Sequence, residues 1–380
     1  MKNLLLFSLL FLGLLFFSGL NPLLAQTVNA AKVCDLPAEL SETSGLIKIG
    51  PNKFVSHNDS GNEPILFVFD SSGLIQRRIK ISNAQNVDWE DLTMDSKGNV
   101  YIGDFGNNNS DRTNLRIYVV ASPNTYTKDS TIAGITNFTY SDQKAFPPAV
   151  AYQNFDMESF FWFNDSLYLF SKNRTNPYSG YTKCYRLPAR SGTFVAQLID
   201  SFYTGSGGYL NYSVTGGAAF ANGNKIALLG YDKVWLFSGF NGNRFFKGTA
   251  NTLAFPNLSQ KEALWFENTN TLWYTQETSA LGTAGLFRFN LPNLTPSGLI
   301  ELQKKYYKIY PNPAEHILCV EVHDDIAEPA MLLDILNLEG RLVLKDEIEP
   351  QVINKLNISN LAKGKYFVRI NGILAGSFLK

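Results

Sequence analysis

The chain of 380 residues has few of the side chains that most often carry chemistry or link a fold covalently. It contains three cysteines and three histidines, and no cysteine spacing resembles a zinc site. A bridge between Cys34 and Cys184 suits an exported protein, but the alternating strand around Cys184 suits a buried free thiol equally well, so the pairing stays open. The 33 basic and 33 acidic side chains cancel without a basic patch, which argues against nucleic acid as a partner.

Long apolar runs are also scarce. Only residues 4–20 approach the length of a membrane span. They follow a basic start, end at the break Asn21-Pro22 and are followed by the small residue Ala25. This order is typical of a secretory signal peptide, so we expect residues 1–25 to be removed and no transmembrane segment to remain. The alternative is an uncleaved membrane anchor.

What the chain does have is aromatic residues, at 13% against 17% charged residues, a balance that suits an all-β extracellular protein. Five stretches resemble one another: each begins with a small or acidic residue, runs through an apolar strand, turns, and returns through a second strand. Their first residues are Glu42, Glu90, Glu158, Gly216 and Glu262. Strand repeats of roughly 40–50 residues are typical of a β-propeller.

We therefore predict a β-propeller over residues 26–300, with five blades, or six if the stretches 121–157 or 188–214 hide another. The outer strand of the fifth blade has two candidates, residues 298–302 and the early segment 28–33. An N-terminal strand in that place closes the ring and removes a free sheet edge.

A different pattern begins at Tyr310-Pro311-Asn312-Pro313, after an expected linker at 301–309. Short alternating strands separated by turns predict a small Ig-like β-sandwich over residues 310–380. With the stretch Gly364-Lys365-Tyr366-Phe367-Val368 and the ending Phe378-Leu379-Lys380, this segment resembles the type A C-terminal sorting domain of the type IX secretion system of Bacteroidota. The resemblance implies the secretion machinery as a partner and a secreted or surface-attached protein that passes through the periplasm. The alternative is an accessory sandwich that binds a ligand.

Strand alternation places the entrances to the inner strands and the loops between second and third strands on one face of the disc. These loops are longer and more polar than the turns on the other face, which makes this the expected functional face. The candidate binding residues are Glu42, His57, Asp59, Asp88, Glu90, Asp104, Asn107, Arg112, Glu158 and Glu262.

Four of these candidates, Glu42, Glu90, Glu158 and Glu262, occupy equivalent repeat positions, and the inner strands line the central channel. Carboxylates brought together at one mouth repel one another unless a cation or hydrogen bonds compensate. Ca²⁺, which prefers oxygen ligands, is the candidate cofactor in an extracellular setting. The competing interpretation is structural: each glutamate accepts backbone hydrogen bonds from the next blade and fixes blade packing.

Catalytic signals are weak. His57 is the propeller's only histidine, and no nucleophile-elbow sequence accompanies it. The stretches around Asp88-Trp89-Glu90-Asp91 and Gly103-Asp104-Phe105-Gly106 resemble an uncharacterised family of propellers in exported Bacteroidota proteins, and distantly resemble Ca²⁺-associated lactonase and phytase-like propellers. We expect a module that binds a ligand or partner through the face described above. The rivals are a Ca²⁺-dependent hydrolase of the lactonase or phosphoesterase type, and a structural surface protein.

Overall fold

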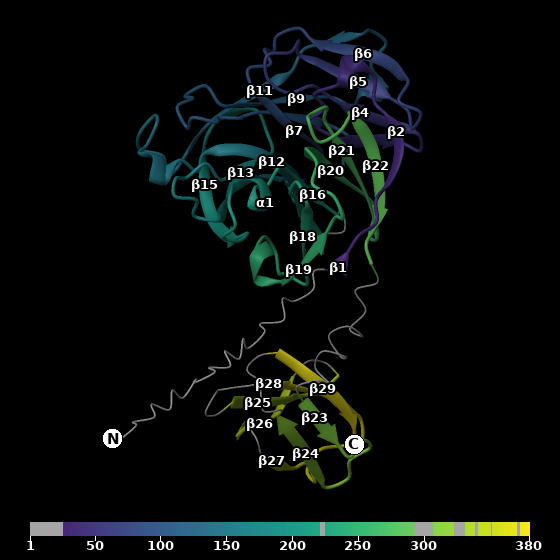
Figure 1. Ribbon diagram of the computed structural model, residues 1–380, viewed down its shortest axis with the longest axis vertical. Helices are drawn as coiled ribbons and strands as arrows, with labels where there is room; N and C mark the ends of the chain where they lie inside the picture. Colours follow the sequence, from purple (N-terminus) through teal and green to yellow (C-terminus); the bar gives the residue numbers. More distant parts are fainter. Residues whose placement is uncertain are drawn as a thin grey trace, which may run out of the picture. The chain divides into compact units, whose positions relative to one another are not determined.

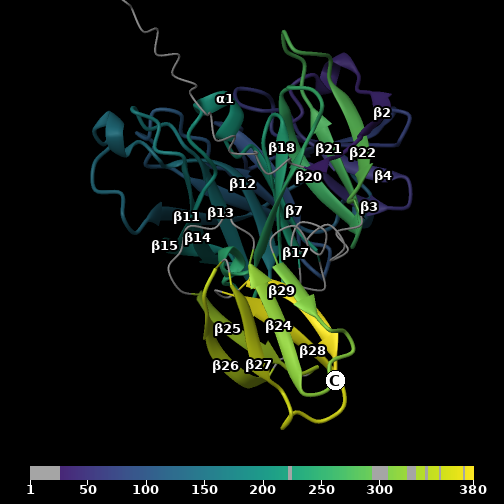
Figure 2. The same ribbon diagram turned by 60° about the horizontal axis from the view of Figure 1, so that its bottom comes forward.

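The structure is a computed structural model that describes residues 26–220, 225–292, 307–322, 331–338, 341–350, 352–370 and 373–380. The chain divides into two compact units, Met1–Pro292 and Asn293–Lys380, each of which is described by itself (Figures 1 and 2). Strands make up 53% of the structure and helices 5%. None of the helices within the described ranges has the length and apolar character needed to cross a membrane. The expected signal peptide lies outside the described residues.

The first unit is built from five blades that each run from an inner to an outer strand, and two of these blades are joined in one eight-stranded sheet. The inner strands are β3 (Ile47–Gly50), β7 (Trp89–Met94), β12 (Asp156–Phe163), β16 (Gly216–Ala219) and β20 (Lys261–Asn268). The second strands are β4 (Lys53–Ser56), β8 (Val100–Asp104), β13 (Ser166–Lys172), β17 (Lys225–Leu229) and β21 (Thr271–Gln276). Each second strand pairs antiparallel with its inner strand.

The outer half of each blade repeats the same antiparallel order. The third strands are β5 (Ile65–Phe69), β9 (Arg116–Val120), β14 (Tyr181–Pro188), β18 (Lys233–Ser238) and β22 (Gly285–Asn290). The outer strands are β6 (Ile75–Ile81), β11 (Gly134–Tyr140), β15 (Gly192–Tyr203), β19 (Thr249–Ala254) and β2 (Ala31–Asp35). In Figure 1 the strands β7, β12, β16 and β20 lie around the middle of the unit, while β6, β15 and β2 lie at its periphery.

Two short strands and five helical turns are added to these five blades. The two-residue strands β1 (Gln26–Thr27) and β10 (Ser130–Thr131) extend blades four and one by parallel pairing with β19 and β6. A parallel pairing of β11 with β15 joins the outer edges of blades two and three. The helical turns are η1 (Ala38–Leu40), η2 (Pro123–Thr125), η3 (Val150–Tyr152), α1 (Tyr209–Tyr212) and η4 (Phe245–Lys247).

The early strand β2 completes the last blade. It pairs antiparallel with β22, from Ala31 opposite Arg288 to Asp35 opposite Gly285. The N-terminal candidate for the fifth outer strand is therefore confirmed, at residues 31–35 in place of the expected 28–33, whereas residues 298–302 lie outside the described residues. Five blades are present in the described part of the first unit, and the stretches 121–157 and 188–214 contain no sixth inner strand.

Alternation along the strands sends neighbouring side chains into different blade interfaces. Phe54 packs with Trp273 and Leu286 of blade five, whereas the next residue, Val55, packs with the core of blade two. The remaining three interfaces each have a buried apolar cluster of their own, which makes five clusters for five blades. A cluster between every pair of neighbours, including blades five and one, means that the ring is closed.

Hydrogen bonds tie the inner strands together near the axis. Ser44 Oγ donates to the carbonyl of Glu90 at 2.6 Å, and the buried Asp91 accepts from the backbone N–H of Phe160 at 3.2 Å. Thr93 Oγ1 likewise accepts from the N–H of Trp162 at 2.9 Å. These bonds join blade one to two and blade two to three.

The three cysteines are free. Cys184 lies fully buried in β14 among aromatic side chains of blades three and four, and Cys34 lies in β2 of blade five. Of the two interpretations of Cys184, the structure therefore favours the buried thiol over the bridge.

The second unit packs two small sheets around one apolar core. The first has the order β23 (Tyr307–Tyr310), β24 (Ile317–Val322) and β27 (Ile353–Asn357). The second has the order β26 (Leu342–Ile348), β25 (Met331–Leu336), β28 (Lys365–Ile370) and β29 (Ile373–Leu379). This is the antiparallel sandwich expected from the alternating sequence pattern.

Closure by β2 leads to a stability prediction. Deleting residues 26–35 from the mature protein should lower its unfolding temperature and promote aggregation, because it unpairs the edge of β22 and removes the buried Val28 from the apolar cluster between blades four and five. Thermal unfolding followed by circular dichroism, together with light scattering, measures both effects. An unfolding transition equal to that of the intact protein would mean that β2 does not close the ring.

Candidate functional site

Three glutamates reach the axis through the same local irregularity. In β7, β12 and β20 the pairing register shifts at Glu90, Glu158 and Glu262, so each glutamate is the extra residue of a β-bulge. Bulges bend a strand and re-aim a side chain, and they are common beside functional sites. All three glutamates are buried, with exposures of 4–5%.

The glutamates meet aspartates from the same mouth of the channel. Ligand oxygens of Asp59, Asp88 and Glu90 lie within 4.8 Å of one another, and so do those of Glu90, Asp156 and Glu158. Glu90 belongs to both groups and therefore joins them into one carboxylate cluster. We call these five residues the mouth cluster.

Two cations neutralise one side of the mouth cluster. Lys172 at the end of β13 pairs with Glu158 at 2.9 Å, and Arg174 pairs with Asp156 at 2.6 Å and Glu158 at 3.2 Å. Tyr209 of α1 lies over the Arg174 guanidinium at 4.8 Å from the ring centre. The carboxylates of Asp88, Glu90 and Glu262 make no hydrogen bond or ion pair within the described residues, so the structural interpretation of Glu90 and Glu262 as acceptors for the next blade is wrong.

Burial and mutual repulsion raise the pKa values of these carboxyl groups. Desolvation, reinforced by Glu158 and Asp59, raises the pKa of Glu90 well above its usual range. Desolvation and then Asp59 raise the pKa of Asp88 to about 7. The same order of causes raises the pKa of Glu277, at the end of the second strand of blade five, to about 8. The mouth therefore favours bound protons or a bound cation at neutral pH.

Asp104, Asn107 and Arg112 support the mouth from the loop after β8. Asp104 accepts from the backbone N–H of Asp88 at 3.1 Å and from Arg112 at 2.9 Å. Asn107 donates its backbone N–H to Asp156 at 2.6 Å and accepts from the backbone of Arg112 at 2.9 Å. A Cβ at Gly106 would collide with the carboxylates of Asp88 and Glu90, so a side chain there would displace them from their present positions.

Two sequence candidates lie elsewhere than expected. His57 is fully buried, its Nδ1 bonds the carbonyl of Asn58 at 2.9 Å, and its ring packs edge-on against Trp89. Desolvation lowers its pKa to about 4, so it is a neutral core residue. Glu42 is exposed, precedes β3 and accepts a hydrogen bond from Asn62.

Glu42 therefore does not share the position of the other three glutamates. Ile47 pairs with Val55 in blade one, as Leu92 pairs with Ile102 in blade two. Glu90 lies two residues before Leu92, whereas Glu42 lies five residues before Ile47, so the predicted equivalence is corrected. Gly45 holds the equivalent place, where a side chain would collide with Leu92 and His57.

Sequence reasoning assigned the loops that contain Lys172, Arg174 and Glu277 to the expected functional face but did not select these residues for the site. It passed over Asp156, which lies at the start of β12 beside them. It also expected nothing at the opposite mouth, where the turns are short. A hollow of about 680 Å³ opens there, at the far ends of the inner strands. Its lining includes Lys48, Trp162, Phe220, Trp265 and Glu267.

Comparison with known proteins defines the second unit. Residues 308–375 match the family model of the secretion system C-terminal sorting domain. The chain thus carries a type IX secretion system sorting domain behind a β-propeller, as the sequence resemblance indicated. No curated protein matches the chain.

Solved structures resemble the chain only weakly. The PQQ-bound aldose sugar dehydrogenase of Streptomyces coelicolor is 10% identical with a TM-score of 0.39, over 69% of this chain and 98% of that one. A putative gluconolactonase is 13% identical with a TM-score of 0.38, over 69% and 92%. PorZ of Porphyromonas gingivalis is 12% identical with a TM-score of 0.34, over 89% of this chain and 44% of PorZ.

The raised pKa of Asp88 leads to a pH prediction for protein kept in chelator. In the unfolded chain the Asp88 pKa is near 3.8, and in the folded protein it is about 7. The stability that this group contributes is full below about pH 4 and is lost as the pH rises through about 7. An asparagine in this position does not titrate, so the unfolding temperature of Asp88→Asn should fall less between pH 5 and pH 8 than that of the unaltered protein.

The exposed Asp111 provides the matched control, because Asp111→Asn removes a carboxylate without altering the mouth cluster. This control should follow the unaltered protein across the whole pH range. Equal pH profiles for Asp88→Asn and the unaltered protein would contradict a raised pKa at Asp88.

Proposed function

We propose that this protein is an exported β-propeller that binds a ligand at the mouth cluster, with a divalent cation as part of the binding site. The observation that carries the proposal is an excess of buried and half-buried carboxyl groups over the cations that could neutralise them. Seven acidic side chains surround Lys172 and Arg174, namely Asp59, Asp88, Glu90, Asp156, Glu158, Glu262 and Glu277.

The cation is best placed at Asp59, Asp88 and Glu90. These residues offer only oxygen ligands, the set preferred by Ca²⁺, and no lysine or arginine pairs with them within the described residues. Asp59 is held for this role because its loop is anchored: Asn86 Nδ2 donates to the Asp59 carbonyl at 2.7 Å. Gly106 leaves the space beside Asp88 and Glu90 free of a side chain.

The neighbouring cations suit a polar ligand with its own negative or hydroxyl groups. Lys172 and Arg174 pair with Glu158 and Asp156, the members of the mouth cluster that are not proposed as cation ligands, and Tyr209 lies beside both cations. A ligand at the mouth could contact the cation through one oxygen and Arg174 through another. Charged groups that fix orientation at a concave site are common in small-molecule recognition.

One observation favours the rival hydrolase. A carboxyl group with a pKa of about 7, as at Asp88, can give or take a proton near neutral pH. A screen of lactones and phosphoesters with added Ca²⁺ separates the two functions. Turnover that disappears in Asp88→Asn would replace the binding proposal by the enzymatic one.

Calcium should stabilise the protein measurably. At about 100 times its Kd a ligand adds about 2.7 kcal/mol, which for a domain of this size raises the unfolding temperature by roughly 5–10 °C. Glu90→Gln should abolish this shift and should itself stabilise the cation-free protein, because it removes a buried carboxylate from a repulsive cluster. Differential scanning calorimetry in chelator and in Ca²⁺ measures both effects.

The control is Glu63→Gln, since Glu63 is exposed and pairs only with Lys80 at 3.3 Å. This variant should show the same calcium-induced rise in unfolding temperature as the unaltered protein. If chelator and Ca²⁺ give the same transition for the unaltered protein, the cation is removed from the proposal.

The sorting domain leads to a prediction about location. In a bacterium with a type IX secretion system, protein lacking residues 301–380 should fold but stay in the periplasm, because the signal read by the secretion machinery is gone. Protease accessibility and antibody labelling of intact cells measure display. Display of the shortened protein at the level of the complete one would contradict a sorting role for the second unit.

A further inference from the structure

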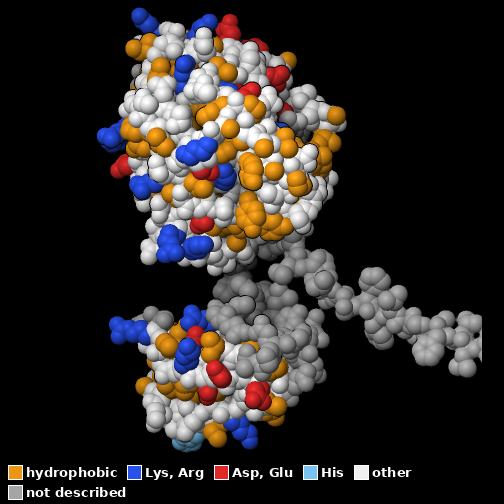
Figure 3. Space-filling view, turned by 90° about the vertical axis from the view of Figure 1, so that its left-hand side faces the viewer, with side chains coloured by type: hydrophobic (Ala, Val, Ile, Leu, Met, Phe, Trp, Pro, Cys, Tyr) orange, Lys and Arg blue, Asp and Glu red, His pale blue; other side chains and the backbone are white. Residues whose placement is uncertain are grey.

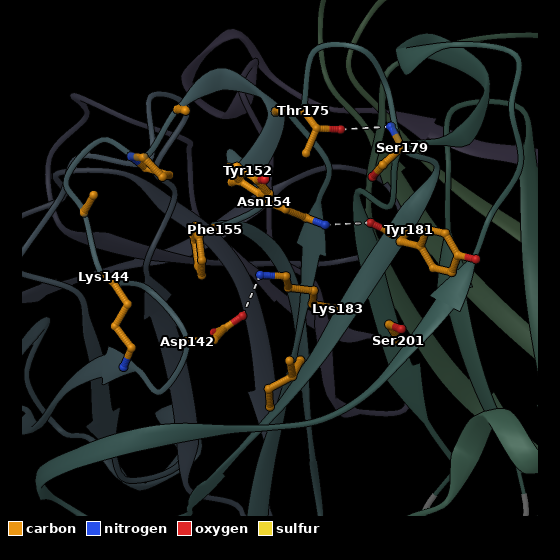
Figure 4. Close-up of a pocket in the computed structure, with 15 residues that line it drawn as sticks. Asp142, Lys144, Tyr152, Asn154, Phe155, Thr175, Ser179, Tyr181, Lys183 and Ser201 are labelled. Atoms are coloured by element: carbon orange, nitrogen blue, oxygen red, sulfur yellow. Dashed lines mark hydrogen bonds and ion pairs between the residues drawn. The ribbon is translucent and has the colours of Figure 1, made fainter.

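A second pocket lies at the rim of the propeller, away from the axis. It has a volume of about 590 Å³ and is formed by the connection 141–155 between blades two and three, the loop after β13, and strands β14 and β15 (Figure 4). The lining residues used below are Asp142, Tyr152, Asn154, Phe155, Tyr181 and Lys183. None of them belongs to the mouth cluster.

The pocket contains a hydrogen-bond acceptor without a partner among the described residues, the side-chain oxygen of Asn154. Its side chain is 5% exposed, and its Nδ2 donates to the carbonyl of Tyr181 at 2.9 Å, which fixes the orientation of the amide. Its Oδ1 is buried and has no hydrogen-bond partner within the described residues. An unpaired buried acceptor is costly, so a ligand that donates a hydrogen bond to this oxygen gains that energy back on binding.

Two of the three charged side chains that line the pocket pair with each other, and the third, Lys144, donates to the carbonyl of Ser141 at 2.7 Å. Lys183 pairs with Asp142 at 2.7 Å, and the other oxygen of Asp142 accepts from the hydroxyl of Tyr185 at 2.8 Å. The Lys183 ammonium also lies 3.9 Å from the centre of the Phe155 ring. Figure 4 shows this pair beside Phe155. The pocket therefore offers further polar contacts to a ligand without demanding a charged one.

Aromatic side chains stand open to solvent around these polar groups. Tyr152 is 71% exposed and Tyr181 46% exposed, although both line the pocket. Leu198 of β15 adds an aliphatic wall and is 40% exposed. Figure 3 faces the side of the propeller on which β15 lies in Figure 1, and hydrophobic side chains gather on it.

We propose that this pocket is a saccharide-binding site, the ligand being a neutral sugar of one or two rings. A sugar has hydroxyl groups that can donate to Asn154 Oδ1 and apolar ring faces that can pack on Tyr152 or Tyr181. A purely apolar ligand would leave the Asn154 oxygen unpaired and would bury the Lys183–Asp142 pair. An inorganic anion could approach Lys144 but would make no use of the aromatic walls.

The test uses the complete mature protein and a panel of methyl glycosides of glucose, galactose, mannose and N-acetylglucosamine, with the corresponding disaccharides. Saturation-transfer NMR identifies a binder, and calorimetry gives its affinity. Tyr152→Ala should weaken binding by at least about tenfold, because it removes the aromatic wall. Tyr152→Phe keeps the ring and should retain most of the affinity.

Tyr152 is so exposed that its replacement should leave the fold intact, which unfolding temperatures will check. Ile132→Ala is the matched control, because Ile132 is 74% exposed and does not line the pocket. The affinity of this variant for the sugar should equal that of the unaltered protein. Failure of every sugar in the panel to bind would overturn the proposal. So would sugar binding that survives Tyr152→Ala unchanged, or that is lost in Glu90→Gln instead, since binding would then lie at the mouth.

Discussion

Each blade of this propeller has two apolar faces, and both can be buried only if the ring closes. Phe54 and Val55, adjacent in β4, illustrate the constraint, because one needs blade five and the other blade two. The pairing of β2 with β22 supplies the last connection. Once the ring is closed, the inner strands share one axis, and the residues at their entrances must meet whether or not their charges favour it.

The mouth cluster follows from this constraint. Packing and bulges, with no attraction between the side chains, bring Glu90, Glu158 and Glu262 together, and only Glu158 gains ion pairs there. The fold tolerates the remaining carboxyl groups by shifting their pKa values upward. An arrangement that costs stability and serves no packing purpose is typical of a site selected for binding or chemistry. The supporting loop around Asp104 and Arg112 is consistent with that interpretation, since it holds Asp88 in place.

Much of the fold was predictable because alternation and turns are local properties. The five inner strands, the early closing strand and the terminal sandwich follow from such patterns. Glu42 was misplaced because the repeat in blade one was counted from Glu42, three residues before Gly45, which holds the equivalent place. Asp156, Lys172 and Arg174 could not be ranked above other polar strand ends, since only closure of the ring brings them to Glu90. The rim pocket depends on residues 141–155, which belong to no repeat.

The closing strand β2 also limits when the propeller can finish folding. Residues 31–35 are synthesised early, yet their partner Gly285–Asn290 follows only after four other blades. A chain arranged this way cannot complete its disc until both segments are available, and contacts of such large sequence separation are slow to form. Until they form, the ring stays open with an unpaired edge on blade five, which is a surface for pairing with another chain.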